Sequence, residues 1–255
     1  MTKMEENNAY HFIGIGDLGK MIVEEIQGES SCEWIKNPGE LAANADIILQ
    51  QHNNGYGLIV EYEPEWDTYL NNPQILDLLH HADFAVVALH QSQSEEFELT
   101  DRRFLYLFNE IPKTILSMPK RNRRDDMLQM RKGIACMIRA IYAPGVVCID
   151  LEDIAIPGQN HCYGTIYHAS CEASDQMPEC AERLINHTMS EICPQDIIYF
   201  HLLFASGKDT TLMTLINAAT FIEDALKDDT RLCWSHIIND HSCDITFVVY
   251  RKLKF

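Results

Sequence analysis

The chain has 255 residues, 46% of them hydrophobic, which is enough to bury the core of one large domain or two smaller ones. Its 38 aspartates and glutamates outnumber 20 lysines and arginines, and the net charge of -18 repels polyanions, so we exclude nucleic acid as a partner. The longest apolar runs are far shorter than the roughly 20 residues that span a bilayer, and the amino terminus lacks the pattern of a signal peptide. We therefore expect a cytoplasmic protein that does not bind membranes directly.

The first predicted unit is a strand, a glycine turn and a helix. Gly14, Gly16 and Gly19 form a GxGxxG motif in the strand, turn and helix context that the motif needs. Glycines let the backbone approach a phosphate, and the helix terminus supplies free N–H groups with a partial positive charge. Asp17 lies at the mouth of the turn, where its charge opposes a pyrophosphate.

The next segments alternate strands with helices. A strand over residues 32–36 carries Glu33, at about the right distance to hold a ribose hydroxyl, so an NAD(P)-dependent oxidoreductase stays open as an alternative. Residues 37–50 are predicted as a turn, a short helix and a third strand. Residues 50–67 are rich in Asn, Gly, Glu, Tyr and Trp and are predicted as a packed loop. This alternation favours a parallel sheet that is covered on both faces.

A helix and a buried strand over residues 73–90 lead into an acidic segment. A phosphate-binding α/β protein is expected to place glycines and hydroxyls at the carboxyl end of such a strand. This chain has no glycine there and places four acids that repel a phosphate: Glu95, Glu96, Glu98 and Asp101.

Another helix and strand are predicted over residues 102–118, followed by a basic run at 120–124. A long helix over residues 125–142 then carries apolar side chains on several faces, which indicates burial between two layers. Asp125 and Asp126 suit its positive amino-terminal end.

Residues 143–153 contain a Pro-Gly turn, an apolar strand-like segment and the acids Asp150, Glu152 and Asp153. Three acids at the exit of a buried strand form a costly local charge. They are either a solvated strand-to-helix turn or a group that faces a cation, a polarised water or a partner surface.

The remaining chain is predicted as an α+β layer in which two helices cover one face of a small sheet. The second helix is expected to begin at a cap provided by Asp209 or Thr210. The predicted strands and helices occupy residues 160–169, 177–189, 196–205, 207–226, 231–238 and 244–252.

Nine cysteines without a CxxC pair are expected to be reduced thiols packed as small hydrophobes. One cluster has ligand types suited to zinc: His161, Cys162, His168 and Cys171. Its spacing matches no compact zinc motif, and strand alternation sends successive residues to opposite faces, so we expect no metal site there.

The order of segments in the carboxyl-terminal half is typical of a known family. Residues 143–154 look like a synergy loop, residues 178–189 like the helix that follows the next strand, and residues 196–222 like a strand, turn and helix. Residues 236–250 look like a closing hairpin. In this order the segments resemble the tubulin/FtsZ family, and its bacterial and archaeal FtsZ branch in particular. Asp150 and Asp153 match the two synergy-loop aspartates, whereas Cys148 replaces the family's asparagine.

The amino-terminal half resembles the same family more faintly. The glycine turn matches the family's first glycine loop, Asn37 matches an asparagine after the second strand, and Asp125 or Asp126 matches the guanine-reading acid. The family's glycine-rich phosphate loop is replaced by the acidic segment. The resemblance implies an α/β, Rossmann-like domain over residues 1–121 that is degenerate for nucleotide binding. A central helix over 122–142 and a carboxyl-terminal domain over 143–255 complete the expected tubulin/FtsZ-like fold.

In this family, subunits stack head to tail, and the synergy-loop acids of one subunit act on the nucleotide of the next. Because the chain keeps Asp150 and Asp153 but lacks the phosphate loop, we expect no intrinsic GTPase activity and no required cofactor. Gly14, Gly16 and Gly19, with Asn37 and Asp125, would be remnants of a GTP or GDP site. The expected role is a pseudo-GTPase that docks on or modulates filaments of an FtsZ-like protein through the synergy-loop face. Two alternatives stay open: a nucleotide-independent self-assembling protein and a divergent GTP-binding homologue.

Overall fold

The structure, a computed structural model, describes residues 10–27, 31–52, 55–69, 71–90, 108, 111–118, 124–239 and 242–252. Its strands are β1 His11–Ile15, β2 Ser31–Ile35, β3 Gly57–Tyr62, β4 Phe84–His90, β5 Lys113–Met118, β6 Gly145–Val147, β7 Cys162–Ser170, β8 Ile197–Ser206, β9 Arg231–Ile238 and β10 Asp244–Lys252. Its α-helices are α1 Gly16–Ile26, α2 Pro38–Gln51, α3 Pro73–His81, α5 Arg124–Tyr142, α6 Leu151–Gln159, α7 Met177–Glu191 and α8 Leu212–Ala225.

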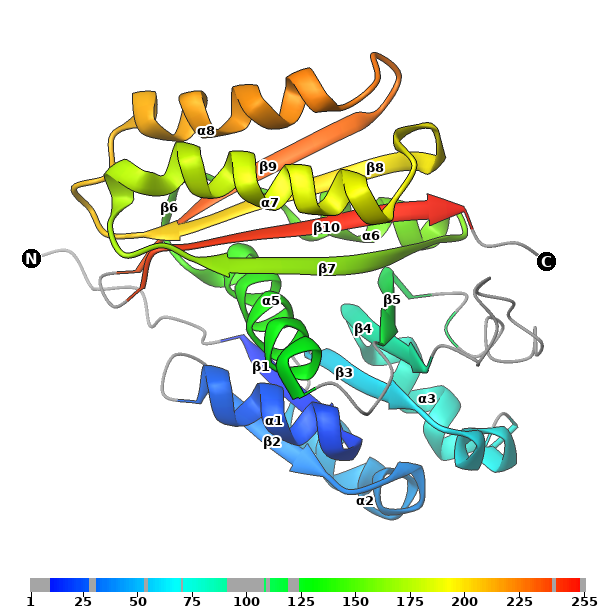
Figure 1. Cartoon of the computed structure of the whole chain (residues 1–255). Coiled ribbons are helices and arrows are strands. Elements are labelled where there is room, and N and C mark those ends of the chain that lie inside the picture. Colours follow the sequence, from blue (N-terminus) through cyan, green and yellow to red (C-terminus); the bar gives the residue numbers. More distant parts are fainter. Residues whose placement is uncertain are drawn as a thin grey trace, which may run out of the picture.

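All of these strands belong to one ten-stranded sheet in the order β2-β1-β3-β4-β5-β7-β10-β8-β9-β6 (Figure 1). The strands from β2 to β5 are parallel, whereas β10 runs antiparallel to both β7 and β8. The parallel part meets the rest through a single register pair between Leu116 of β5 and Gly164 of β7. The sheet therefore consists of two well-paired parts that share a narrow junction.

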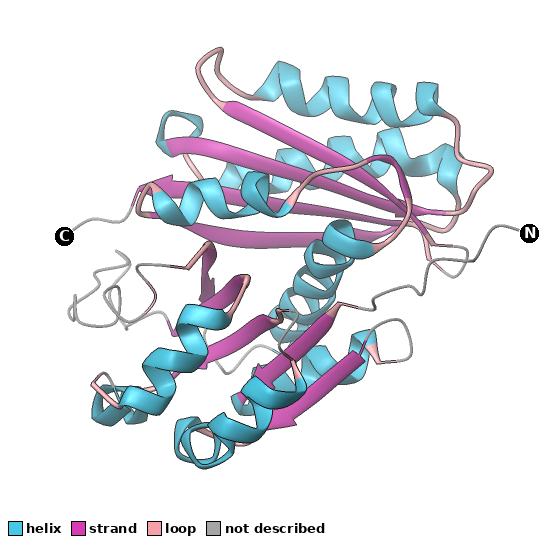
Figure 2. Cartoon of the chain, turned by 180° about the vertical axis from the view of Figure 1, so that it is seen from behind, coloured by secondary structure: helices cyan, strands magenta, loops and turns pink. Residues whose placement is uncertain are grey.

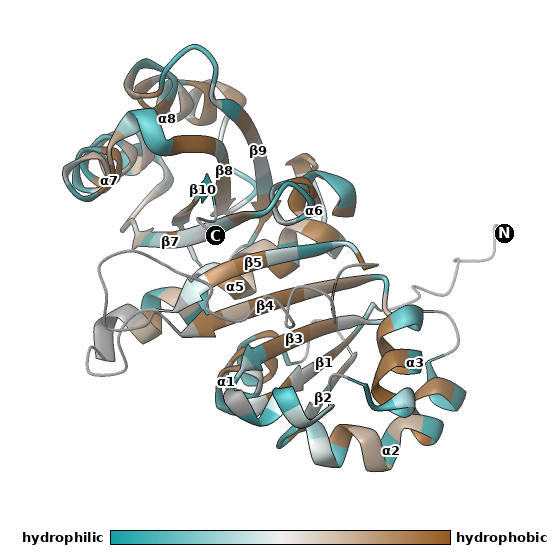
Figure 3. Ribbon diagram, turned by 90° about the vertical axis from the view of Figure 1, so that its right-hand side faces the viewer, coloured by the Kyte–Doolittle hydropathy of each residue, from teal (hydrophilic) through white to brown (hydrophobic). Residues whose placement is uncertain are grey.

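The parallel strands are apolar along most of their length, as the hydropathy colouring of β3 and β4 shows (Figure 3). Such near-continuous burial is expected where helices cover both faces of a parallel sheet. The α2 and α3 face forms one core cluster around Ile13, Leu58 and Trp66. On the opposite face, α1 and α5 pack a second cluster that continues across the junction to α6.

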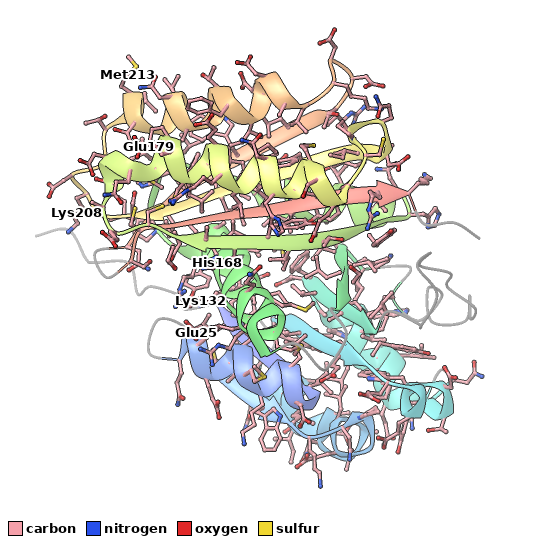
Figure 4. All side chains as sticks on the ribbon, in the orientation of Figure 1. Glu25, Lys132, His168, Glu179, Lys208 and Met213 are labelled. Carbon is pink, nitrogen blue, oxygen red and sulfur yellow. The ribbon has the colours of Figure 1, made fainter. Side chains whose placement is uncertain are left out.

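The long helix α5 lies between the two parts of the sheet (Figures 1 and 2). Apolar residues around its circumference, including Ile134 and Met137, are fully buried, which confirms the burial predicted from its many apolar faces. Arg131 lies 3.0 Å from the Glu25 carboxylate of α1, and Arg139 donates a hydrogen bond to the Glu25 carbonyl oxygen at 3.0 Å. Figure 4 shows Glu25 on α1 facing α5. These contacts join the first helix to the central one.

The antiparallel part of the sheet carries α7 and α8 on one face and α5 and α6 on the other (Figures 1 and 2). A third core cluster fills the α7 and α8 side around Phe200, Phe247 and Ile222. The prediction of two helices over one face of the carboxyl-terminal strands is confirmed, and the complete fold has the α/β architecture that was expected.

Two predicted elements between residues 37 and 67 are wrong. Residues 37–50 contain no third strand, because Leu41, Ala45 and Ile48 lie at helical spacing and bury one face of the single helix α2. The predicted loop over residues 50–67 instead contains β3, whose short apolar run lies between glycines and a Glu-Tyr pair.

Two further details of the carboxyl-terminal half are also wrong. The last two strands do not form a hairpin, because β9 pairs with β8 in parallel and β10 pairs with the other edge of β8. Helix α8 begins after Thr211, and not after Asp209 or Thr210, since the Thr211 hydroxyl accepts a hydrogen bond from the Thr214 N–H at 3.2 Å. The helix predicted at 102–111, apart from Phe108 and Ile111, lies outside the described residues. Among the described helices, none has the length and apolar character needed to cross a membrane.

Candidate functional site

The acidic loop connects β6 to α6 at one edge of the sheet. Asp150 is the N-cap of α6: its carboxylate accepts a hydrogen bond from the Asp153 N–H at 2.9 Å. The Asp153 carboxylate accepts one from the Asp150 N–H at 3.3 Å. This reciprocal arrangement satisfies backbone donors that the helix start would otherwise leave open. Both aspartates therefore have a structural role as caps.

The loop is open to solvent on its outer side. Asp150 and Glu152 are exposed, and the Val146 side chain of β6 is 56% exposed. The expectation of a buried strand before the acids is wrong, because β6 is a three-residue edge strand. Behind the loop, burial and then the charges of Asp153 and Asp150 raise the pKa of the Cys233 thiol to about 11. The acids thus carry negative charge that faces solvent, and the capping hydrogen bonds hold them at the start of α6.

The glycine turn joins β1 to α1. A Cβ atom on Gly14 would lie 2.4 Å from the Gly19 carbonyl oxygen, and one on Gly19 would lie 2.6 Å from the Gly14 carbonyl carbon. These two glycines therefore allow the helix to pack directly on its own strand. Gly16 has φ +84°, which glycine adopts at no steric cost. All three positions have a structural reason to be glycine that does not require a phosphate.

The amino terminus of α1 is occupied by a side chain of this same chain. Glu61, near the end of β3, is 5% exposed, and its carboxylate accepts a hydrogen bond from the Leu18 N–H at 2.9 Å. The Leu18 N–H belongs to the first turn, where helix donors lack an intrahelical partner and a bound phosphate would be held. The Glu61 Oε2 atom also lies 3.4 Å from the position of a Cβ on Gly16. A carboxylate thus lies where the motif would hold a phosphate oxygen.

An aromatic side chain covers the outer side of the turn. The Trp34 indole donates a hydrogen bond to the Gly16 carbonyl oxygen at 3.0 Å, although the side chain is 41% exposed. The Lys20 ammonium lies 4.8 Å from the centre of the Trp34 ring, within the range of a cation–π contact. Trp34 and Glu61 therefore hold the turn from two sides.

The other predicted nucleotide-site residues lie apart or are already engaged. The Asn37 side chain accepts a hydrogen bond from the Glu40 N–H at 3.0 Å and caps α2. Asp125 is in the first turn of α5, with its side chain outside the described part of the chain. The acidic segment at 91–101 lies outside the described residues. Glu33 lies 3.9 Å from His11, the first residue of β1, whereas the glycine turn follows the last residue of β1.

The four residues with zinc-ligand types, His161, Cys162, His168 and Cys171, are spread along β7 and its ends. Cys162 begins the strand and pairs with Lys252, whereas His168 is near its end and forms a 2.9 Å hydrogen bond with Thr246. Burial lowers the pKa of His168 to about 4. The separation along a nine-residue strand keeps Cys162 and His168 from sharing one ion.

The glycine turn and the acidic loop are not brought together within the chain. β1 is second from one edge of the sheet, and β6 is the strand at the opposite edge. The two motifs can therefore meet only across an interface between two molecules.

Glu61 is the residue that sequence reasoning missed. It follows the apolar run Leu58, Ile59 and Val60, and a polar residue at the carboxyl end of a buried parallel strand is placed where ligands of α/β folds bind. The prediction of a loop over residues 50–67 hides this signal.

Strand order, helix placement and the position of the acidic loop define a mixed α/β fold built on one ten-stranded sheet. The sequence matches no protein-family model and no curated protein. Solved structures do match. An empty dimer of FtsZ from M. jannaschii superposes with a TM-score of 0.62 at 11% identity, covering 96% of this chain and 88% of that chain.

Two further solved structures extend the likeness beyond FtsZ. CetZ from Methanosaeta thermophila gives a TM-score of 0.59 at 9% identity and covers 96% of this chain and 87% of that chain. TubZ of Bacillus thuringiensis, in GDP-form protofilaments, gives 0.53 at 10% identity, with coverages of 97% and 87%. The chain therefore has the tubulin/FtsZ-like fold over nearly its whole length.

Proposed function

We propose that this protein is a pseudo-GTPase of the tubulin/FtsZ fold that docks on an FtsZ-like filament through its acidic loop and modulates the filament. Two of the matched structures are assemblies, which supports the proposal. TubZ is present as GDP-form protofilaments, and FtsZ is present as a dimer. The proposed docking through the acidic loop face and the proposed lack of nucleotide binding rest on residues of this chain.

The observation that carries the proposal is the contact between Glu61 and Leu18. A nucleotide phosphate at the start of α1 would have to displace a buried carboxylate from the Leu18 N–H or lie beside it as a like charge. Asp17, exposed at the same turn, adds a second negative charge. The site therefore opposes a phosphate both by occupancy and by charge.

The acidic loop supports the docking half of the proposal. Asp150 and Glu152 are exposed beside an exposed apolar side chain, Val146, at the edge of the sheet. Charged groups around an exposed apolar residue are suited to a protein interface. Since the chain's own glycine turn is remote, these acids would face a nucleotide-bearing subunit of another protein.

The first experiment identifies nucleotide released from the purified, denatured protein and measures GTP turnover with Mg²⁺. We expect no stoichiometric GDP or GTP and no turnover. Stoichiometric guanine nucleotide would overturn the pseudo-GTPase half and favour a divergent GTP-binding protein.

The second experiment adds the protein at substoichiometric amounts to a polymerising FtsZ from the same cell and follows light scattering and GTP turnover. We expect both to change, and no change in either would overturn docking. Asp150→Asn combined with Glu152→Gln removes two charges but keeps a side chain that can cap α6, so this variant should lose the effect with little loss of stability. Glu179→Gln, at an exposed position on α7, is the matched control and should retain the effect (Figure 4).

A nucleotide-independent self-assembling protein is the second candidate. It is favoured by apolar side chains on the outer surface of α8, where Leu212 is 49% exposed and Met213 is 63% exposed. Filaments of the pure protein without GTP in electron micrographs would favour this candidate over docking on another protein. The oxidoreductase alternative is not supported, because Glu33 lies beside His11 and not at the glycine turn.

A further inference from the structure

Three side chains with metal-binding atoms meet at the amino-terminal end of β1. His11 begins β1, Glu33 lies in the middle of β2, and His52 directly follows α2. The Nε2 atoms of both histidines lie 3.9 Å from the Glu33 Oε2 atom. One ligand atom from each of the three residues lies within 4.8 Å of the other two. The cluster is at the end of the strand opposite to the glycine turn, so it is independent of the nucleotide question.

His11 is arranged as a ligand whose binding atom lacks a partner. The residue is 9% exposed, and its Nε2 atom makes no hydrogen bond within the described part of the chain. Its Nδ1 atom lies 2.8 Å from the Ser31 hydroxyl. When Ser31 accepts the Nδ1 proton, the Nε2 atom carries the free lone pair that a metal requires. An outer hydrogen bond of this kind is the usual support of a metal-binding histidine.

Burial of the His11 ring favours its uncharged form. A neutral imidazole is the form that binds metals. The Glu33 carboxylate beside the two rings supplies the negative charge that a divalent cation needs for compensation.

We propose that His11, Glu33 and His52 bind a divalent transition metal of the zinc class, through both Nε2 atoms and the carboxylate. Two histidines and one carboxylate are a known zinc ligand set, with a fourth position left for water. Ligands at bond lengths near 2.0 Å in a tetrahedral site are roughly 3.3 Å apart, so the 3.9 Å separations must close by about half an ångström.

His52 is the ligand that must move. The two imidazole rings are stacked, with centroids 3.5 Å apart and planes 15° apart, so their Nε2 lone pairs lie in nearly parallel planes and do not meet at one point. His52 is the C-cap of α2, and its side chain is 18% exposed. A turn of this ring makes the two lone pairs converge. The bound ion would join the edge strand β2 to β1 and to the end of α2, which stabilises the folded chain in proportion to the metal concentration.

The test is a titration of the reduced, metal-stripped full-length protein with Zn²⁺, followed by calorimetry and by thermal unfolding. We expect one equivalent to bind and the Tm to rise with Zn²⁺. His52→Ala and, independently, Glu33→Gln should abolish both effects. Ser31→Ala should weaken binding by about 10- to 100-fold, because it removes only the outer hydrogen bond. His187→Ala is the control, since His187 lies 3.8 Å from Glu191 in an exposed pair that has no third ligand among the described residues, and it should bind like the wild type.

Cobalt distinguishes this site from the nine cysteines of the chain. Co²⁺ at the proposed site should show ligand-field bands without the intense thiolate charge-transfer band that cysteine ligands produce. Three results would overturn the proposal: no rise in the Tm of the wild type with Zn²⁺, equal binding by the wild type and His52→Ala, or a thiolate band with Co²⁺.

Discussion

Replacement of Glu61 by glutamine tests whether this carboxylate serves as an internal anion for the start of α1. A hydrogen bond to a charged acceptor contributes about 1.5–3 kcal/mol and a neutral one about 0.5–1.5 kcal/mol. Glutamine keeps an oxygen within reach of the Leu18 N–H, so Glu61→Gln should lower the free energy of unfolding by about 1–2 kcal/mol. For a protein of this size, that loss corresponds to a fall in Tm of about 2–8 °C.

The measurement is thermal and urea unfolding of the variant beside Glu24→Gln, an exposed carboxylate near the other end of α1. The control should change the stability by a few tenths of a kcal/mol at most. If Glu61 were an uncompensated buried charge, its neutralisation would stabilise the protein. A Tm that rises, or that equals the control, would therefore refute the assigned role of the carboxylate.

A second measurement asks whether Glu61 excludes anions. Glu61→Ala removes the carboxylate from the Leu18 N–H, so millimolar pyrophosphate should raise the Tm of this variant but leave the wild type unchanged. Equal stabilisation of both proteins would show that the helix start is open in the wild type.

Three further predictions concern other parts of the chain. Asp150→Ala should lose about 1 kcal/mol of stability through the α6 cap, whereas Asp150→Asn should lose only a few tenths, as measured by urea unfolding. Gly14→Ala should cost about 2 kcal/mol or more, because its Cβ meets the Gly19 carbonyl oxygen at 2.4 Å, and the soluble yield and Tm report the loss. Burial lowers the pKa of His201 from 6.5 to about 4, so the unfolded chain takes up this proton first as the pH falls. Stability should therefore drop between about pH 6.5 and 4, by on the order of 3 kcal/mol for this residue, and His201→Gln should flatten that dependence.

The elements with strong periodicity were predictable from sequence. The long helix α5, the strand that ends near Leu89 and the helices α7 and α8 all carry patterns that local residues determine. Predictions failed where pairing partners decide the outcome. The pairing of β10 with β8 depends on which edge of β8 is already occupied by β9. The sequence of residues 239–243 does not specify this choice. The prediction of a strand at the end of α2 fails because a short apolar run fits both the helical and the strand period.

The candidate site shows the same division between local and long-range information. The acids Asp150 and Asp153 were found because their spacing is visible in the chain, but their mutual capping depends on the start of α6. The contact of Glu61 with Leu18 joins residues 43 positions apart, through the pairing of β3 with β1. The cluster of His11, Glu33 and His52 likewise depends on strand register and on the length of α2. Such contacts are invisible to spacing rules.

The occupied start of α1 has a consequence for timing. A nucleotide exchanges with solution and changes charge on hydrolysis, so a protein that binds one alternates between states at the expense of chemical energy. The Glu61 carboxylate is part of the chain, and its occupancy depends neither on concentration nor on any reaction. Under the proposed function, an assembly that contains this protein would therefore have no nucleotide-driven step at this position. Its growth and disassembly would follow reversible equilibria set by protein concentration, ions and the turnover of its neighbours.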